Sequence, residues 1–258
     1  MIVPALNDTN LVVAGNLVTD FQSSGSGVID IAIGAAGRWR ADTGVTSVGG
    51  LVSAWASSIV GADILSAVGA ARPTLTNNSL LINNKPFIQF NSATNLDGVL
   101  TGAGAGIFPG HIFCLFAKVN PYTAGYVFDF KAGGVSQNKL YSNNNQNTVT
   151  PNAWGALDID GAGTQYFLAV QTTNTLVVYE VVTQALVDGV GGSLSASNAD
   201  ELKLGVGAFG IAELVVYETE LGANDLQQTL AYFFQRYSTG VIPVPITFPE
   251  DTVLTPNT

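Results

Sequence analysis

The sequence predicts an all-β protein with one helix near its C-terminal end, and three observations lead to this prediction. Short apolar and β-branched runs recur along the chain, each bounded by Gly, Asn, Ser, Asp or Pro, the residues that form turns. Glycine alone fills 29 of the 258 positions, which favours many turns. Only residues 222–237 show the three- and four-residue apolar spacing of a helix. Many short strands separated by turns predict a β-sandwich or barrel.

The expected strands follow from the apolar runs. They are residues 28–33, 80–82, 87–90, 112–119, 126–130, 166–171, 176–182, 202–206 and 211–217. Residues 112–116, IFCLF, are apolar throughout, so we expect this strand to be buried on both faces. Cys114 within it is expected to be a buried structural thiol, and His111 before it to lie in a turn.

The predicted helix, residues 222–237, places Leu226, Leu230, either Phe233 or Phe234, and Tyr237 on one apolar face. Gly222 suits the N-cap position, and acidic Asp225 follows in the first turn, where a carboxylate is favourable.

The chain divides into three predicted parts. Residues 1–27 form an N-terminal arm, residues 28–240 the β-sandwich, and residues 241–258, with four of the ten prolines, an extended tail. We expect no secretion signal, because the first residues lack a basic region and an uninterrupted apolar run. No stretch is apolar enough to predict a membrane span.

The composition excludes several classes of protein. Charged residues make up 11% of the chain and hydrophobic residues 47%, the reverse of a disordered chain. Nine Lys and Arg residues in a chain of net charge −10 do not form the basic surface that nucleic acid requires. Cys114 is the single cysteine and His111 the single histidine, so neither a disulfide framework nor a Cys/His zinc site is expected.

The best candidates for ligand binding lie in and beside the Asn-rich segment 142–150, which we expect to be an exposed loop. Trp154 follows it and stands among Pro, Asn and Gly residues. An exposed aromatic ring covers the apolar face of a sugar, while amides and hydroxyls bind its hydroxyl groups. We therefore predict glycan binding by Tyr141, Asn143, Asn145 and Trp154, with packing of Trp154 beneath its own loop as the alternative.

No catalytic or metal-binding constellation is predicted. Asp158 and Asp160 lie on one face of a short segment, but the next acid along the chain is Glu180, so a third local partner is missing. These two aspartates, or Asn95 with Asp97, are candidate calcium ligands, and a solvated turn is the simpler interpretation of both pairs. We predict no catalytic residue, no metal and no cofactor.

Three segments together resemble concanavalin A-like (laminin-G-like) jelly-roll domains. Residues 37–55, GRWRADTGVTSVGGLVSAW, resemble the opening strands of that family. The sequences ARPT at 71–74 and NKPFIQFN at 84–91 resemble its next conserved segment. Residues 210–237, GIAELVVYETELGANDLQQTLAYFFQRY, resemble its closing strand and helix. The resemblance covers about residues 30–240.

The resemblance implies a concanavalin A-like jelly-roll β-sandwich of two antiparallel sheets with one short C-terminal helix, and it puts Trp39 and Trp55 in the core. The E-x-D-x-x-E pattern of the family's glucanases does not occur in this chain. Two loops are linked in some relatives to metal or ligand sites. Where the family usually has D-x-S-G-N-G-N, this chain has SSIVGAD at 57–63, and where it usually has an acidic residue, this chain has Asn91. Both departures again predict no calcium ion.

Domains of this kind without a secretion signal are common in the particles of tailed bacteriophages. The resemblance therefore implies a non-catalytic structural or adhesion protein of a virion, either a capsid decoration or a fibre or tail component, made in the host cytoplasm. Its predicted partners are major capsid or tail proteins held through the chain ends, a host or environmental glycan, and further copies of itself, with a trimer expected. The alternative is a free-standing carbohydrate-binding module or glycan-cleaving enzyme of the same fold.

Overall fold

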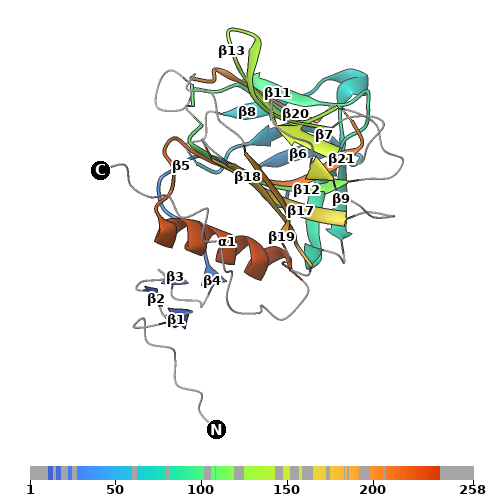
Figure 1. Cartoon of the computed structure of the whole chain (residues 1–258). Coiled ribbons are helices and arrows are strands. Elements are labelled where there is room, and N and C mark those ends of the chain that lie inside the picture. Colours follow the sequence, from blue (N-terminus) through green and yellow to red (C-terminus); the bar gives the residue numbers. More distant parts are fainter. Residues whose placement is uncertain are drawn as a thin grey trace.

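The structure is a computed structural model, and it describes the body of the chain together with short strands before it (Figure 1). The described residues are 11–13, 16–18, 23–24, 28–59, 63–79, 82–101, 106–107, 109–118, 125–142, 148–151, 157–158, 165–172, 175–182, 184, 186–191, 198–205 and 207–238. The predicted tail, residues 241–258, lies outside them, as does most of the predicted arm, residues 1–27.

The described part is mostly β-strand, with one α-helix near its C-terminal end, as predicted. The strands are β1 (Leu11–Val13), β2 (Asn16–Val18), β3 (Ser23–Ser24), β4 (Val28–Ile29), β5 (Ala35–Arg40), β6 (Val45–Val48), β7 (Leu51–Ala56), β8 (Ile64–Ser66), β9 (Thr74–Ser79), β10 (Lys85–Gln89), β11 (Leu96–Val99), β12 (His111–Lys118), β13 (Gly125–Ala132), β14 (Val135–Ser142), β15 (Thr148–Pro151), β16 (Leu157–Asp158), β17 (Gln165–Thr172), β18 (Thr175–Glu180), β19 (Leu186–Gly191), β20 (Glu201–Leu204) and β21 (Phe209–Tyr217). The helices are η1 (Gly69–Ala71), a single 3₁₀ turn, and α1 (Ala223–Tyr237).

Strand β21 lies at the centre of the first of two runs of strands. It pairs with β12 on one side and with β5 and β10 on the other. The run continues from β12 through β17 and β18 to β19, and from β10 to β9. All residues of β21 are buried, as expected for a strand covered on both faces.

The second run consists of β6, β7, β8, β11, β20, β13 and β14, each paired with the next. Strand β15 follows β14, and β16 follows β15. Leu51 of β7 lies opposite Thr74 of β9 and joins the two runs. All described pairings are antiparallel, and those among β5 to β21 make a curled sheet that closes on itself. Strands β1 and β2 form a separate two-stranded sheet, as do β3 and β4.

Apolar side chains from both runs pack into one core inside the curled sheet. Trp39 of β5 and Trp55 of β7 are fully buried there, which confirms their predicted place in the core. The indole N–H of Trp39 donates to the backbone oxygen of Asp63 at 3.3 Å, and that of Trp55 donates to Arg40 at 2.8 Å. Both rings therefore contribute their full apolar area without leaving a buried donor unpaired.

Strand β12 separates this core from a second one. Ile112, Cys114 and Phe116 point into the inner core, whereas Phe113 and Leu115 point toward α1. The prediction that this strand is buried on both faces is confirmed. Cys114 is fully buried, and burial raises the pKa of its thiol, so it is an inert packing residue as predicted.

Helix α1 covers the outer face of the first run, and Figure 1 shows it below the sheet. Leu230, Phe233 and Tyr237 are buried against β12 and β21, which confirms the predicted apolar face. Gly222 is the N-cap, as predicted, and its extended backbone needs no side chain to begin the helix.

Residues 28–32 run along α1 and are held by its side chains. The backbone N–H of Ile29 donates to Oε1 of Gln235 at 3.1 Å, and that of Ala32 donates to Oγ1 of Thr229 at 3.2 Å. The described body therefore starts and ends beside the same helix.

Two local predictions are wrong. His111 is the first residue of β12 and is buried, because its imidazole stacks on Phe113 at a centroid distance of 4.7 Å instead of facing water in a turn. Residues 80–81 of the predicted strand at 80–82 lie outside the described residues, and Ile82 lies in the turn after β9 (Thr74–Ser79) instead of in a strand. Backbone pairing with β10 makes the polar segment 74–79 a strand, although its sequence lacks an apolar run.

No helix within the described residues is long and apolar enough to cross a membrane.

Candidate functional site

An outward-facing row of polar side chains crosses the second run of strands. Ser66 of β8 lies opposite Asp97 of β11, which lies opposite Lys203 of β20. Lys203 lies opposite Asp129 of β13, and Asp129 lies opposite Lys139 of β14. Residues directly opposite each other on antiparallel strands share a face, with Cβ atoms about 5 Å apart. The row is therefore continuous across five strands.

A second row lies beside the first. Glu201 of β20 has Val99 of β11 on one side and Lys131 of β13 on the other, and Nζ of Lys131 lies 3.8 Å from Oε1 of Glu201. Val99 is 67% exposed and Ile64 of β8 is 48% exposed, so a small aliphatic area borders the charged groups.

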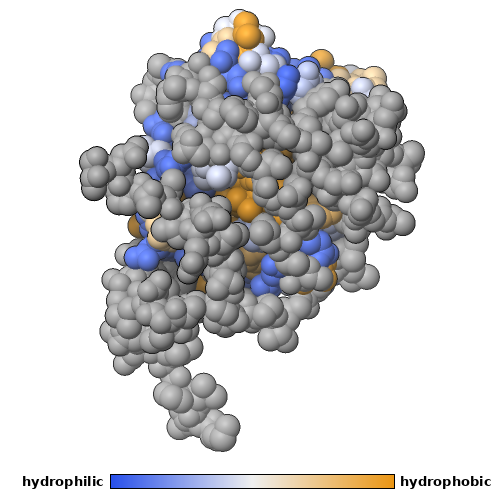
Figure 2. All heavy atoms as spheres, viewed as in Figure 1, coloured by the Kyte–Doolittle hydropathy of each residue, from blue (hydrophilic) through white to orange (hydrophobic). Residues whose placement is uncertain are grey.

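We call these two rows the polar face. It consists of Ile64, Ser66, Asp97, Val99, Asp129, Lys131, Lys139, Glu201 and Lys203. In the space-filling view, hydrophilic residues gather at the end of the molecule where β13 lies in Figure 1 (Figure 2).

Asp129 is the unusual member of the polar face, because only 2% of it is exposed. Its Oδ2 accepts a hydrogen bond from Oγ of Ser136 at 2.7 Å, whereas its Oδ1 is buried without a partner. Burial raises the pKa of Asp129, and the Ser136 hydrogen bond and nearby lysines offset this only in part. A buried carboxyl oxygen without a partner is rare in folded proteins and favours a functional role.

The lysines on either side of Asp129 do not pair with it. Among the described residues, neither Lys139 nor Lys203 forms an ion pair, and Lys139 lies with Nζ 5.5 Å from the ring centroid of Tyr126. Ammonium groups without a carboxylate partner can bind a ligand with no internal ion pair to break.

The predicted binding residues are only partly described. Tyr141 lies in β14, with its backbone opposite Tyr126 of β13 and Thr150 of β15. The predicted loop at 142–150 is wrong at both ends, because Ser142 belongs to β14 and residues 148–150 belong to β15. The side chain of Tyr141 lies outside the described residues, as do Asn143, Asn145 and Trp154. The structure thus puts the backbone of Tyr141 two residues along β14 from Lys139, at the border of the polar face.

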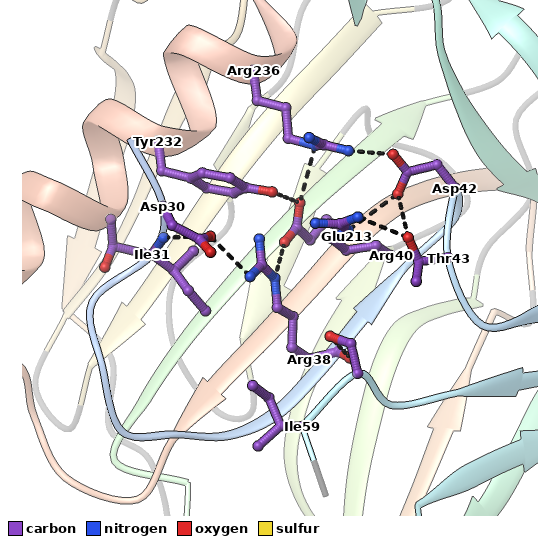
Figure 3. Close-up of polar contacts among 12 residues, drawn as sticks. Asp30, Ile31, Arg38, Arg40, Asp42, Thr43, Ile59, Glu213, Tyr232 and Arg236 are labelled. Atoms are coloured by element: carbon purple, nitrogen blue, oxygen red, sulfur yellow. Dashed lines mark hydrogen bonds and ion pairs between the residues drawn. The ribbon is translucent and has the colours of Figure 1, made fainter. Parts of the chain in front are cut away.

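A buried carboxylate, Glu213 of β21, is the centre of a separate polar network beneath α1 (Figure 3). Its Oε1 accepts a hydrogen bond from Nε of Arg38 at 2.8 Å. Its Oε2 accepts from the hydroxyls of Tyr232 at 2.8 Å and Tyr237 at 2.7 Å, and Nε of Arg236 lies 3.9 Å away. Because these partners come from β5 and α1, Glu213 ties both elements to β21.

The Glu213 network is an anchor and not a reaction site. Its carboxylate is fully buried, and both of its oxygens already accept hydrogen bonds from Arg38, Tyr232 and Tyr237. Burial and the charge of Glu213 raise the pKa of Tyr232, which keeps its hydroxyl a hydrogen-bond donor. Toward the surface, Nη1 of Arg38 pairs with Asp30 at 2.9 Å, and Asp42 pairs with Arg236 (Figure 3).

The candidate calcium ligands are only partly described. Among the described residues, no group of three or more His, Cys, Asp or Glu side chains converges on one point. Asp97 belongs to the polar face, next to Lys203. Asp158 is the last residue of β16, opposite Thr148, instead of lying in the predicted turn, and Asp160 is outside the described residues.

No protein-family model matches this sequence, and no curated protein is similar to it. Among solved structures, the chain is similar to Trypanosoma rangeli sialidase, with a TM-score of 0.50 and 13% identity, over 90% of this chain and 36% of the sialidase. The same sialidase in complex with the inhibitor DANA gives a TM-score of 0.50 and 11% identity, over 89% of this chain and 36% of that one. A GH54 α-l-arabinofuranosidase gives a lower TM-score of 0.47 with 9% identity, over 85% of this chain and 63% of the enzyme.

At these identities the similarity shows the fold alone, and the chain spans about a third of the sialidase's length. The comparison nevertheless corrects the prediction that this protein is not an enzyme. The sialidase structures named above are glycosidases, so this comparison contradicts that prediction, and it shows a shared fold and no activity of this chain. The prediction inferred the absence of catalysis from the absence of one glucanase pattern, whereas carboxyl groups on different strands can meet without any local sequence motif.

Proposed function

We propose that this chain is a carbohydrate-recognising domain of the concanavalin A-like class that binds glycan on its polar face. In this proposal the two runs of strands are the two sheets of a jelly-roll sandwich, packed across the inner core. What supports the sandwich is that Trp39 and Trp55, one from each run, are buried in one apolar cluster.

One observation carries the proposal: carboxylate, hydroxyl and ammonium groups lie side by side across five strands on a face that no described helix covers. The equivalent face of the first run is covered by α1. Sugars are bound by convergent hydrogen-bonding groups beside a small apolar surface, and Ile64 and Val99 supply that surface. The fold shared with the sialidase is consistent with a carbohydrate-related role.

A glycan array followed by calorimetry tests the proposal. The wild-type chain is expected to bind at least one glycan, and Asp97→Ala to weaken that binding about tenfold by removing a hydrogen-bond acceptor. Lys85→Ala, on β10 in the other run, is the matched control and should leave affinity unchanged. Trp154→Ala tests the predicted contribution of the adjoining loop. Equal effects of Asp97→Ala and Lys85→Ala would contradict the polar face as the site.

Glycan cleavage is the second candidate function, and Asp129 is the observation that favours it. A glycosidase needs one carboxyl group with a raised pKa as proton donor and a second as base or nucleophile. Asp129 has the raised pKa, and Glu201 lies diagonally across from it on β20. A reducing-sugar assay should then lose turnover with Asp129→Asn or Glu201→Gln while binding persists. Loss of turnover only with Asp158→Asn or Asp160→Asn would move the active site to β16.

A role in a virion remains part of the proposal. What supports it is the hydrogen bond between Ile29 and Gln235, because the segments before residue 28 and after residue 238 then leave the body beside the same helix. Held there by a capsid or tail protein, as one copy of a trimer, the domain would present the polar face outward. Deletion of residues 241–258 should reduce its retention on purified particles, measured by mass spectrometry. Unchanged retention, with residues 1–27 also removed, would contradict this role.

A further inference from the structure

We infer that the ligand of the polar face is an anionic saccharide chain, with negative groups on separate sugar residues that Lys139 and Lys203 bind. This inference rests on the proposed glycan binding and goes beyond it by naming the class of glycan.

The positions of the two lysines indicate a chain and not a single small anion. Lys139, Asp129 and Lys203 lie directly opposite one another on β14, β13 and β20. Two strand spacings separate the lysine backbones, about 9.5 Å. The ammonium of Lys139 lies over the ring of Tyr126, 5.5 Å from its centroid, which favours two separate positive positions.

Asp129, between the two lysines, forms no ion pair or hydrogen bond with either of them. Oδ2 of Asp129 is occupied by Ser136, and its buried Oδ1 meets no ammonium group. The groups that face Asp129 are Lys203 and Glu201 from β20, Lys139 and Ser136 from β14, and Lys131 from its own strand. Because the pKa of Asp129 is raised, its negative charge is lost at a higher pH than that of an exposed aspartate.

The distribution of charge over the chain leads to the same conclusion. The polar face holds three of the nine basic and three of the nineteen acidic residues, so it is neutral while the rest of the chain carries the entire net charge of −10. Three of the five lysines in the sequence lie on it. A polyanion therefore meets less net repulsion on this neutral face than on average over the rest of the chain.

The remaining groups select a saccharide and not simply any polyanion. Glu201 is engaged by Lys131 at 3.8 Å, whereas Asp97 forms no ion pair among the described residues and can accept hydrogen bonds from sugar hydroxyls. Val99 and Ile64 add an exposed aliphatic area for the apolar face of a sugar ring.

Dextran and dextran sulfate form a matched probe pair, because they share one backbone and differ only in charge. We expect the full-length chain to bind dextran sulfate in preference to dextran at about 0.15 M salt, where long-range electrostatic attraction is screened. Lys139→Gln and Lys203→Gln should each weaken binding about five- to tenfold. Lys85→Gln, which removes the same charge from β10, should change the affinity less than about twofold. Unfolding curves of each variant confirm that all are folded.

The outcomes separate this inference from the proposed function. Array binding to neutral glycans, with no preference for dextran sulfate, overturns the inference and leaves glycan recognition in place. If Lys85→Gln and Lys203→Gln lose equal affinity for dextran sulfate, the inference is also overturned, because the ligand would then be attracted by positive charge anywhere on the protein. Binding to no glycan on the array and to neither dextran overturns both.

Discussion

Acidification should destabilise this protein through His111, the single histidine of the chain. Its imidazole is 1% exposed and stacked on Phe113. Nδ1 accepts a hydrogen bond from the backbone N–H of Leu221 at 3.3 Å, just before α1, and Nε2 is buried without a partner. Burial lowers the pKa of His111 to about 4, although nearby Glu220 opposes the shift. Protonation would turn the acceptor of Leu221 into a donor and bury a charge beneath the start of the helix.

The sign and size of the effect follow from linkage. In the unfolded chain a histidine has a pKa near 6.5, so between about pH 6.5 and pH 4 only the unfolded state binds the proton. The contribution of neutral His111 to the free energy of unfolding is therefore fully present above pH 6.5, and it is lost as the pH falls toward 4. At pH 4.5 the loss amounts to about 2.5 kcal/mol.

Urea unfolding at pH 7 and pH 4.5 measures this loss, with His111→Asn as the comparison. Asn retains an acceptor near Nδ1 but does not titrate, so the variant should lose about 2.5 kcal/mol less than wild type between the two pH values. Its lower stability at pH 7 is a packing effect that cancels in the difference. Equal pH dependence of the two proteins, or an NMR titration of the imidazole near pH 6.5, would refute the reasoning.

Three further predictions concern the core and the sheet. Glu213→Gln should lower the free energy of unfolding, measured in urea, by about 3 kcal/mol, because it leaves the buried Arg38 guanidinium without its carboxylate. Asp30→Asn, at a side chain that is 59% exposed, should lower it by under about 1 kcal/mol. Equal losses of stability in the two variants would contradict the anchoring role. Gly98→Ala should lower the free energy of unfolding by about 2 kcal/mol, because the new Cβ would collide with the backbone of β8. Gly222→Ala, whose Cβ meets nothing within 4 Å, should lower it by under about 1 kcal/mol. Similar unfolding midpoints of the two variants would argue against the close approach of β8 and β11. Cys114, fully buried with a raised thiol pKa, should react with a thiol reagent only at the rate of unfolding, and rapid labelling of the native protein would show that β12 is accessible.

The elements that the sequence predicts well are those whose own residues decide their burial. The apolar spacing of residues 222–237 indicates a helix with one buried face, and α1 has that face. The uninterrupted apolar run at 112–116 indicates burial on both sides, and β12 lies between two cores. The core positions of Trp39 and Trp55 were predicted from the resemblance to concanavalin A-like domains, and both residues are fully buried.

The elements that the sequence misses are those decided by distant partners. Strand β9 (Thr74–Ser79) is polar and forms because β10 pairs with it. His111 is polar by type, yet the neighbouring Phe113 and the chain before α1 bury it.

The polar face was missed for the same reason, although it left a local signal. In FDFK at 128–131 and ELKL at 201–204, charged and apolar residues alternate, which indicates charges on the outer face of each strand. Alternation does not reveal that β13 and β20 are neighbours, and only that pairing brings Asp129 beside Lys203. Trp154, Asn143 and Asn145 remain predictions.

Hydrogen–deuterium exchange with and without dextran sulfate tests most directly whether the polar face is the ligand-binding surface. Bound ligand should slow exchange in β13, β14 and β20, residues 125–142 and 201–204, and leave residues 28–32 and 223–238 unchanged. Protection confined to the segments around α1, or no protection anywhere, would contradict the account.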